Sequence, residues 1–314
     1  MAKNITFEER YTIECMLNAN YSLESIYSCI KRTYRTLKRE VSRCYPDKYN
    51  ATSAQEHASK KMSRKQDYNL DALAEEYIRD RLVEDKWSPM IISQRIEAAG
   101  FDSISHTYIY SYIQKDKDNG GELYKNLAHP KKYQGRKEYK GSIPNRVSID
   151  QRPEAANDRE RIGDIETDLI VSPKNQGSSL VSSIDRKSRF CCLDKVENKT
   201  KELVCDTVVD SLSNIGFDIF SVTSDNGTEF TDHQVIAEKL KIKYYFADPY
   251  SSYQRGSVEQ LNGLVRRFIP KGTHIDNIDQ SMVKMVENKL NNRPRKVLGW
   301  LSPIEYLKEQ GIHV

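Results

Sequence analysis

The sequence lacks any long apolar run. Nothing in it approaches the roughly 18 consecutive apolar residues that a transmembrane helix needs, and residues 1–10 lack the apolar segment of a signal peptide. The six cysteines form no C-x-x-C spacing, and no histidine pair completes a zinc pattern. We therefore expect a cytoplasmic protein with reduced, partly buried thiols.

A large excess of charge of one sign is also missing, since the net charge is only +4. With 38% hydrophobic and 30% charged residues, the composition is that of a soluble globular protein, and 314 residues predict two or three domains. The small charge excess is unevenly placed, at +5 for residues 1–150 and −1 for the remainder. The N-terminal half is therefore where an acidic polymer is expected to dock.

Residues 1–48 have the pattern of a helix-turn-helix DNA-binding domain. Apolar spacing predicts helices over 7–19 and 23–30, and Thr33 is a capping residue for a third helix with a cationic outer face. Lys31 stands where such units usually have a turn glycine, and a solvated basic helix is the alternative. The candidate DNA contacts on this unit are Arg32, Arg35, Thr36, Lys38, Arg39 and Arg43.

Three further segments precede the C-terminal half. Residues 49–66 are polar and contain few large apolar side chains, which predicts a linker. Residues 67–128 predict three more helices, with Ser88-Pro89 and Ser105 as helix starts. These helices form either a second helix-turn-helix, with His106 and Thr107 as DNA contacts, or a plain helical support. Residues 129–158 read as a basic linker. It is either merely solvated or follows the DNA backbone, with Lys131, Lys132, Arg136 and Lys137 as phosphate contacts.

Three carboxylates mark the remaining part, residues 159–314. Asp168 lies in a predicted strand over 164–172, where an ordinary half-exposed strand is the alternative interpretation. Asp225 ends an apolar run at Asp-Asn-Gly, which places it at the tip of a strand. Glu259 lies in the first turn of a helix with an apolar stripe, and taken alone it is better explained as a structural partner of the helix dipole. Oxygen ligands without a Cys or His cluster favour Mg²⁺, or Mn²⁺ in its place.

The motifs GDIETDLI, TSDNGTEF, FADPYSSYQRGSVEQLNGLVRRFIPKGT and LNNRPRKVLGW, in this order, resemble the bacterial DDE transposases of the insertion-sequence-30 family. The resemblance covers nearly the whole chain. It implies that Asp168, Asp225 and Glu259 are both the catalytic residues and the metal ligands. It also implies an α/β catalytic domain of ribonuclease-H-like (integrase core) fold, preceded by all-α helix-turn-helix units.

In that fold the strand that ends at Asp225 pairs beside the first strand, and the predicted helix over 256–268 brings Glu259 over both aspartates. Further strands are expected at 179–185, 189–196 and 243–247, and further helices at 200–214, 232–240 and 279–291, with a last helix starting at 302–303. Basic side chains in this half that are candidate DNA contacts, or simply surface residues, are Arg266, Arg293, Arg295 and Lys296.

The resemblance predicts a transposase that binds the terminal inverted repeats of its insertion sequence and catalyses metal-dependent cleavage and strand transfer. Two ions would clamp the attacking and leaving oxygens. The implied partners are the double-stranded DNA of the element ends and of the target, with a homodimer or higher homo-oligomer at synapsis, associated with the bacterial nucleoid. Two alternatives stay open: a repressor that has lost catalysis, and a structure-selective nuclease without strand transfer.

Overall fold

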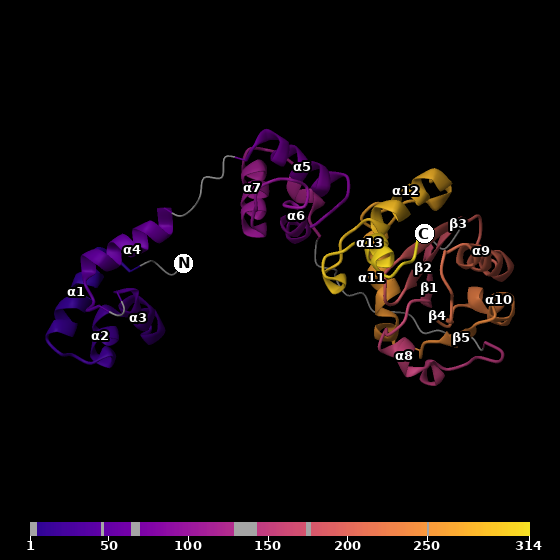
Figure 1. Ribbon diagram of the computed structural model, residues 1–314, viewed down its shortest axis with the longest axis horizontal. Coiled ribbons are helices and arrows are strands. Elements are labelled where there is room, and N and C mark those ends of the chain that lie inside the picture. The colour runs from indigo at the N-terminus through magenta and orange to yellow at the C-terminus, as the bar shows by residue number, and fades with distance from the viewer. Residues whose placement is uncertain (1–4, 45–46, 64–69, 129–142, 174–176, 250) are drawn as a thin grey trace. The chain divides into compact units, whose positions relative to one another are not determined.

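The computed structural model describes residues 5–44, 47–63, 70–128, 143–173, 177–249 and 251–314. It divides into two compact units, Met1–Asp71 and Ala72–Val314 (Figure 1). In the described ranges no helix has both the length and the apolar character needed to cross a membrane. The six cysteines are free thiols, four of them buried, as expected from the sequence.

The first unit is built from short capped helices. Helices α1 (Phe7–Asn18), α2 (Leu23–Ile30) and α3 (Tyr34–Val41) begin after the side-chain caps of Thr6, Ser22 and Thr33, respectively. These helices lie where the apolar spacing predicts them. Their buried faces meet in one small core that includes Ile13, Ile26 and Leu37.

The predicted linker over 49–66 is wrong for most of its length, because residues Ala51–Ser63 form helix α4. Ala51 and Ala54 are buried, and Ala54 belongs to the core of the first unit. The carboxylate of Glu14 accepts hydrogen bonds from the Ala51 amide and the Asn50 side chain at the start of this helix. This helix buries alanines and contains only one large apolar residue, Met62, so hydrophobic periodicity could not reveal it.

The second unit opens with three helices, α5 (Ala72–Val83), α6 (Pro89–Arg95) and α7 (His106–Asp118). Ser88 caps α6 with Pro89 at its first position, and Ser105 caps α7, as predicted. Buried leucine and isoleucine side chains hold the three helices together; they include Ile78, Leu82, Ile92, Ile109 and Ile113. Residues 129–142 of the predicted basic linker lie outside the described residues. The remaining residues, 143–158, contain two short helices, η3 (Ile149–Gln151) and α8 (Glu154–Asn157).

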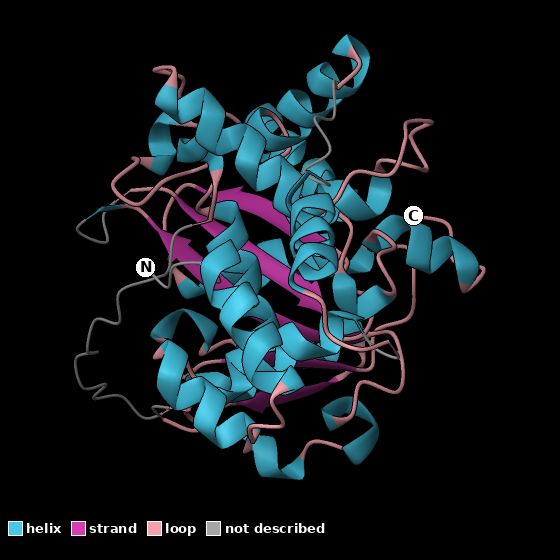
Figure 2. Cartoon of the chain, turned by 90° about the vertical axis from the view of Figure 1, so that its left-hand side faces the viewer, coloured by secondary structure: helices cyan, strands magenta, loops and turns pink. Residues whose placement is uncertain are grey.

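A five-stranded mixed sheet forms the centre of the second unit, in the order β3-β2-β1-β4-β5 (Figure 2). Strands β1 (Asp164–Val171), β2 (Ser179–Asp185) and β3 (Cys191–Val196) form an antiparallel meander. Strands β4 (Ser221–Ser224) and β5 (Lys243–Phe246) continue from β1 in parallel. The prediction that the Asp225 strand pairs beside the first strand is confirmed.

Helices cover both faces of the sheet (Figure 1). Helices α9 (Lys201–Ser213) and α10 (His233–Leu240) bury one face through a cluster that includes Ile165, Val222 and Phe246. Helices α11 (Gly256–Val265) and α12 (Gln280–Asn291) bury the other, through Ile170 and Leu180 among others. The short helix α8 (Glu154–Asn157) precedes β1, and α13 (Pro303–Glu309) follows α12. This arrangement is an α/β fold of the predicted ribonuclease-H-like type.

Side chains of α12 bond the outer edge of β3. The Asn291 amide group accepts from the backbone N–H of Cys191 at 2.9 Å and donates to the carbonyl of the same residue at 2.8 Å. The Glu287 carboxylate accepts from the N–H of Leu193 at 2.5 Å. At the opposite edge, the N–H of Phe246 in β5 donates to the carbonyl of Val147 at 2.9 Å.

Candidate active site and nucleic-acid interface

The sheet brings Asp168 and Asp225 to one place. Strands β1 and β4 pair in parallel with Glu166 opposite Thr223, and β4 ends at Ser224. The same register continued by two residues sets Asp168 opposite Asp225, at the point where β4 leaves the sheet. Asp225 then enters a tight turn, in which its Oδ1 accepts the N–H of Gly227 at 3.0 Å. Both carboxylates therefore face the same end of the parallel pair.

Arg255 links these two aspartates. Its guanidinium lies 3.6 Å from Asp168 Oδ1 and 3.4 Å from Asp225 Oδ2. The Arg255 side chain is only 4% exposed, whereas that of Asp225 is 42% exposed. Sequence reasoning missed this arginine, because one basic residue in a basic-rich chain leaves no periodic signal.

The environment of Asp168 disfavours its charged form. Burial raises the pKa of Asp168 to about 6, while Arg255 beside it acts in the opposite direction. The charge of Asp225 also raises this pKa, and that of Glu229 adds to the effect. Burial and the nearby Asp225 likewise raise the pKa of Glu229. The site is thus rich in carboxylates that repel one another.

Helix α11 presents Glu259 on the side that faces β1. Asn262, one turn later on the same helix face, donates its Nδ2 to Asp168 Oδ2 at 2.8 Å and accepts from Ser182 Oγ at 2.8 Å. Within the described residues, however, no three His, Cys, Asp or Glu side chains lie close enough together to hold a metal ion. The structure therefore gathers two carboxylates around Arg255 and carries the third on the adjoining helix.

A buried ion pair fixes the start of α11. The Glu166 carboxylate is fully buried, contacts Arg186 Nη1 through Oε1, and accepts the N–H of Val258 through Oε2 at 2.9 Å. Arg186 also donates to the carbonyls of Ala156 and Asn157 in α8. The sequence alone gave no signal for Arg186, because its partner Glu166 lies 20 residues away in the chain.

The donor set fits a hard divalent cation. Asp168, Asp225 and Glu259 offer only oxygen ligands, which Mg²⁺ and Mn²⁺ prefer. The two aspartates already share a positive group, and Asp225 remains accessible from solvent.

In the first unit, α3 presents part of its predicted basic face. Arg35, Lys38 and Arg39 are exposed and Thr36 is partly buried. Arg32 is held by a two-pronged ion pair with Glu9, with both N–O distances at 3.0 Å. The predicted contacts Arg35, Lys38 and Arg39 are therefore displayed to solvent, whereas Arg32 is engaged within the unit.

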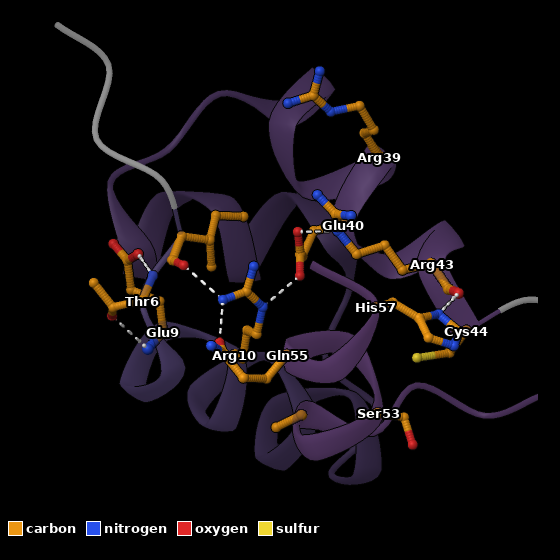
Figure 3. Close-up of polar contacts among 12 residues, drawn as sticks. Thr6, Glu9, Arg10, Arg39, Glu40, Arg43, Cys44, Ser53, Gln55 and His57 are labelled. Atoms are coloured by element: carbon orange, nitrogen blue, oxygen red, sulfur yellow. Dashed lines mark hydrogen bonds and ion pairs between the residues drawn. The ribbon is translucent and has the colours of Figure 1, made fainter. Parts of the chain in front are cut away.

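A buried network supports this face (Figure 3). Arg10 Nε donates to Glu40 Oε1 at 2.7 Å, and its Nη1 donates to the Ile5 carbonyl and to Gln55 Oε1. Arg43 Nε donates to the other Glu40 oxygen at 2.6 Å. Arg43, predicted to contact DNA, thus also ties the end of α3 to this network, while Arg39 points away from it.

The predicted DNA contacts of the second unit fall into two groups. His106 and Thr107 at the start of α7, and Lys296, are exposed. Arg293 is buried and donates to the carbonyls of Asp85 and Lys86, so its side chain is structural and not displayed to DNA.

Arg266 donates to the Val171 carbonyl at 2.9 Å, and Arg295 donates to the Leu290 carbonyl at 3.4 Å. Both guanidinium groups thus donate hydrogen bonds to backbone carbonyls within the second unit. Four predicted contacts of the basic linker lie outside the described residues: Lys131, Lys132, Arg136 and Lys137.

Residues 158–252 match a family model described as "Integrase core domain". The chain is 37% identical to the transposase for insertion sequence element IS4351 of Bacteroides fragilis, over 98% of this chain and 97% of that protein. It is 32% identical to the transposase for IS1086 of Cupriavidus metallidurans, over 96% and 93% of the two chains. Its identity to transposase InsI for IS30A of Escherichia coli is 29%, over 98% and 84%.

The sequence similarity to these transposases covers the helical parts of the chain as well as the sheet. Together with the mixed sheet order and the carboxylates of Asp168 within β1 and Asp225 directly after β4, this similarity identifies an enzyme of the DDE transposase class that has DNA as its partner and depends on divalent metal. The chain belongs to the insertion-sequence-30 family of transposases.

Proposed function

We propose that this transposase binds the terminal inverted repeats of its insertion sequence and cleaves and joins DNA strands with Asp168, Asp225 and Glu259 as its catalytic and metal-holding residues. The observation that carries the proposal is the convergence of Asp168 and Asp225 on one guanidinium, with the Glu259 helix bonded to Asp168 through Asn262. The assignment of Mg²⁺, with Mn²⁺ as substitute and two ions in the site, belongs to this proposal.

The chemistry needs no protein nucleophile. Bound divalent ions would polarise the scissile phosphate and promote formation of hydroxide from water. Asp168 and Asp225 would hold one ion, and Glu259 would help to hold the other. Water first displaces the 3′ oxygen at the element end, and the freed 3′-hydroxyl then displaces a 3′ oxygen in target DNA. Each step exchanges one phosphorus–oxygen bond for another.

The residues around the carboxylates orient them. Asn262 holds one oxygen of Asp168, and the Gly227 amide holds one oxygen of Asp225. The Glu166–Arg186 pair fixes the first turn of α11 and thereby the position of Glu259. The exposed face of α3 and the start of α7 are the parts of the chain that we assign to DNA binding. Because two ends must be joined together, a homodimer or larger assembly acts at synapsis.

The test uses end-labelled duplexes that carry the sequences flanking the gene, incubated with Mg²⁺ and the full-length protein. Wild type should produce free 3′-hydroxyl ends and joined target products. Asp225→Asn and Glu259→Gln should reduce the yield of both products at least a hundredfold. Groups that position and stabilise the reacting atoms change the reaction rate by orders of magnitude. Asp210→Asn and Glu238→Gln alter exposed carboxylates on α9 and α10 and serve as matched controls.

Full Mg²⁺-dependent cleavage by Asp225→Asn would contradict the assignment of the site. Specific binding without any product would instead favour a repressor. Cleavage without covalently joined target DNA would favour a nuclease that does not transfer strands.

A further inference from the structure

Arg255 is an unusual neighbour for two metal-binding carboxylates. It is buried, with its side chain 4% exposed, and it contacts Asp168 at 3.6 Å, Asp225 at 3.4 Å and the Thr167 carbonyl at 3.3 Å. Its Nε is buried and has no hydrogen-bond partner within the described part of the chain. The guanidinium is therefore placed by charge more than by a full set of hydrogen bonds.

The surrounding charges explain why a cation stands there. Asp168 and Asp225 lie close enough for each to influence the other, and Glu229 adds a third negative group. Carboxylates brought together without a counter-charge repel one another and resist burial. A buried arginine between them relieves that repulsion when no other cation is present.

A divalent ion would bind the same carboxylate oxygens of Asp168 and Asp225 that this guanidinium contacts. Mg²⁺ sits at about 2.0–2.1 Å from its oxygen ligands, on carboxylates that already face Arg255 at 3.4 and 3.6 Å. Two cations on one carboxylate pair repel each other, so each weakens the binding of the other. Asp225 is 42% exposed, which leaves an approach from solvent for the ion.

We propose that Arg255 is the internal counter-ion of the metal site, which holds Asp168 and Asp225 together in the metal-free protein and competes with the divalent ion for them. This inference rests on the proposed function, because it takes these aspartates as metal ligands. Arg255 is here a positioning residue whose effect is exerted through the two carboxylates. Because of this competition, a divalent ion binds the two aspartates only when it displaces the guanidinium, either alone or together with DNA phosphates.

The experiment follows thermal unfolding of the full-length protein without DNA, first in EDTA and then over a range of Mg²⁺ concentrations. Arg255→Met should unfold at a lower temperature in EDTA. Its midpoint for Mg²⁺-induced stabilisation should fall at least about fivefold below that of wild type, which is the lower end of usual coupling between two sites. Arg255→Lys keeps the charge and should stay closer to wild type.

Arg293→Met is the matched control, because Arg293 is equally buried but donates only to backbone carbonyls. It should lower the unfolding temperature without moving the Mg²⁺ midpoint. In EDTA, the double variant Asp225→Asn/Arg255→Met should be more stable than Arg255→Met, because one of the repelling charges is gone. If Arg255→Met does not fold in EDTA, its recovery by Mg²⁺ supports the proposal, and Arg255→Lys supplies the midpoint.

A Mg²⁺ midpoint that is unchanged or higher in Arg255→Met, with wild type still responding to the ion, overturns the counter-ion proposal and leaves the proposed function intact. If neither wild type nor any Arg255 variant responds to Mg²⁺ or Mn²⁺, both the counter-ion proposal and the metal site of the proposed function are overturned.

Discussion

Lys31 adopts a backbone conformation that glycine favours. It ends α2 with φ 53° and ψ 40°, and its N–H donates to the Tyr27 carbonyl. In this left-handed region the Cβ of an L-residue crowds the following carbonyl, at a cost of roughly 1–2 kcal/mol. The sequence showed a lysine where a helix-turn-helix usually has glycine, and the turn forms nonetheless.

Replacing Lys31 by glycine should therefore stabilise the protein. Relief of the crowding outweighs the greater freedom of glycine in the unfolded chain, which costs about 0.5–1 kcal/mol, so we expect a net gain of about 0.5–1 kcal/mol. Urea unfolding of the full-length protein, monitored by circular dichroism, measures this change in the stability of the first unit. Arg35→Gly within α3 is the control and should lose about 1 kcal/mol. A loss of stability in Lys31→Gly would contradict this account of the turn.

The raised pKa of Asp168 makes metal binding sensitive to pH. Its folded-state pKa of about 6 exceeds the unfolded value of about 3.9. The folded protein therefore holds this proton more tightly, and in the absence of metal this group makes stability fall as pH rises between those values. A metal ion needs the deprotonated carboxylate, so the Mg²⁺-induced rise in unfolding temperature should be present at pH 7.5 and largely lost at pH 5. An equal rise at both values would be evidence against Asp168 as a ligand.

At the scale of single elements, α11 depends on a buried ion pair at its first turn. Glu166 accepts the Val258 N–H with one oxygen and contacts Arg186 with the other, and neither side chain is more than 6% exposed. The negative charge lies at the N-terminal end of the helix, where backbone N–H groups carry partial positive charge. This contact ties β1, which carries Asp168, to the helix that carries Glu259.

Glu166→Gln should destabilise the protein by about 3–5 kcal/mol, because it leaves Arg186 buried without a counter-charge. Adding Arg186→Met should recover part of this loss, since the double variant no longer buries an unpaired charge. Urea unfolding of Glu166→Gln, Arg186→Met, the double variant and wild type gives the coupling free energy between the two side chains. Strictly additive losses would mean that the two side chains act independently.

The strands and helices of the sheet domain were largely predictable from local pattern. Strand β2 has the expected bounds, 179–185, because it is an apolar run closed by a turn. Helix α4 was missed, because alanines that pack a small core give no apolar stripe. Asp168 and Asp225 could be brought together through the parallel pairing of their strands. Arg255 and Arg186 could not be found, because ion pairs between distant positions leave no periodicity in a single sequence.

At the scale of the whole molecule, basic groups available to DNA are fewer than the sequence count suggests. Several arginines form ion pairs with glutamates inside the protein, among them Arg10, Arg43 and Arg186. If α3 binds DNA as proposed, we expect its exposed cations to contribute more of the attraction to phosphate than an even share of the net charge would indicate.

Salt dependence of DNA binding measures this share. Lys38→Gln in the full-length protein should reduce the slope of log K against log salt by about 0.9, the value for one phosphate contact. Arg32→Gln is the comparison, because Arg32 is engaged with Glu9 and should affect stability more than the slope. Binding of labelled inverted-repeat duplex, followed by fluorescence anisotropy, supplies both slopes. An unchanged slope in Lys38→Gln would remove this residue from the interface.

The covered edges of the sheet limit how copies of this protein can join. An open edge strand invites another chain to add a strand, but Asn291 and Glu287 bond the backbone of β3, and Val147 bonds the end of β5. If copies assemble on two DNA ends as proposed, we expect them to meet through helices, loops or the DNA itself and not by extending one sheet into the next.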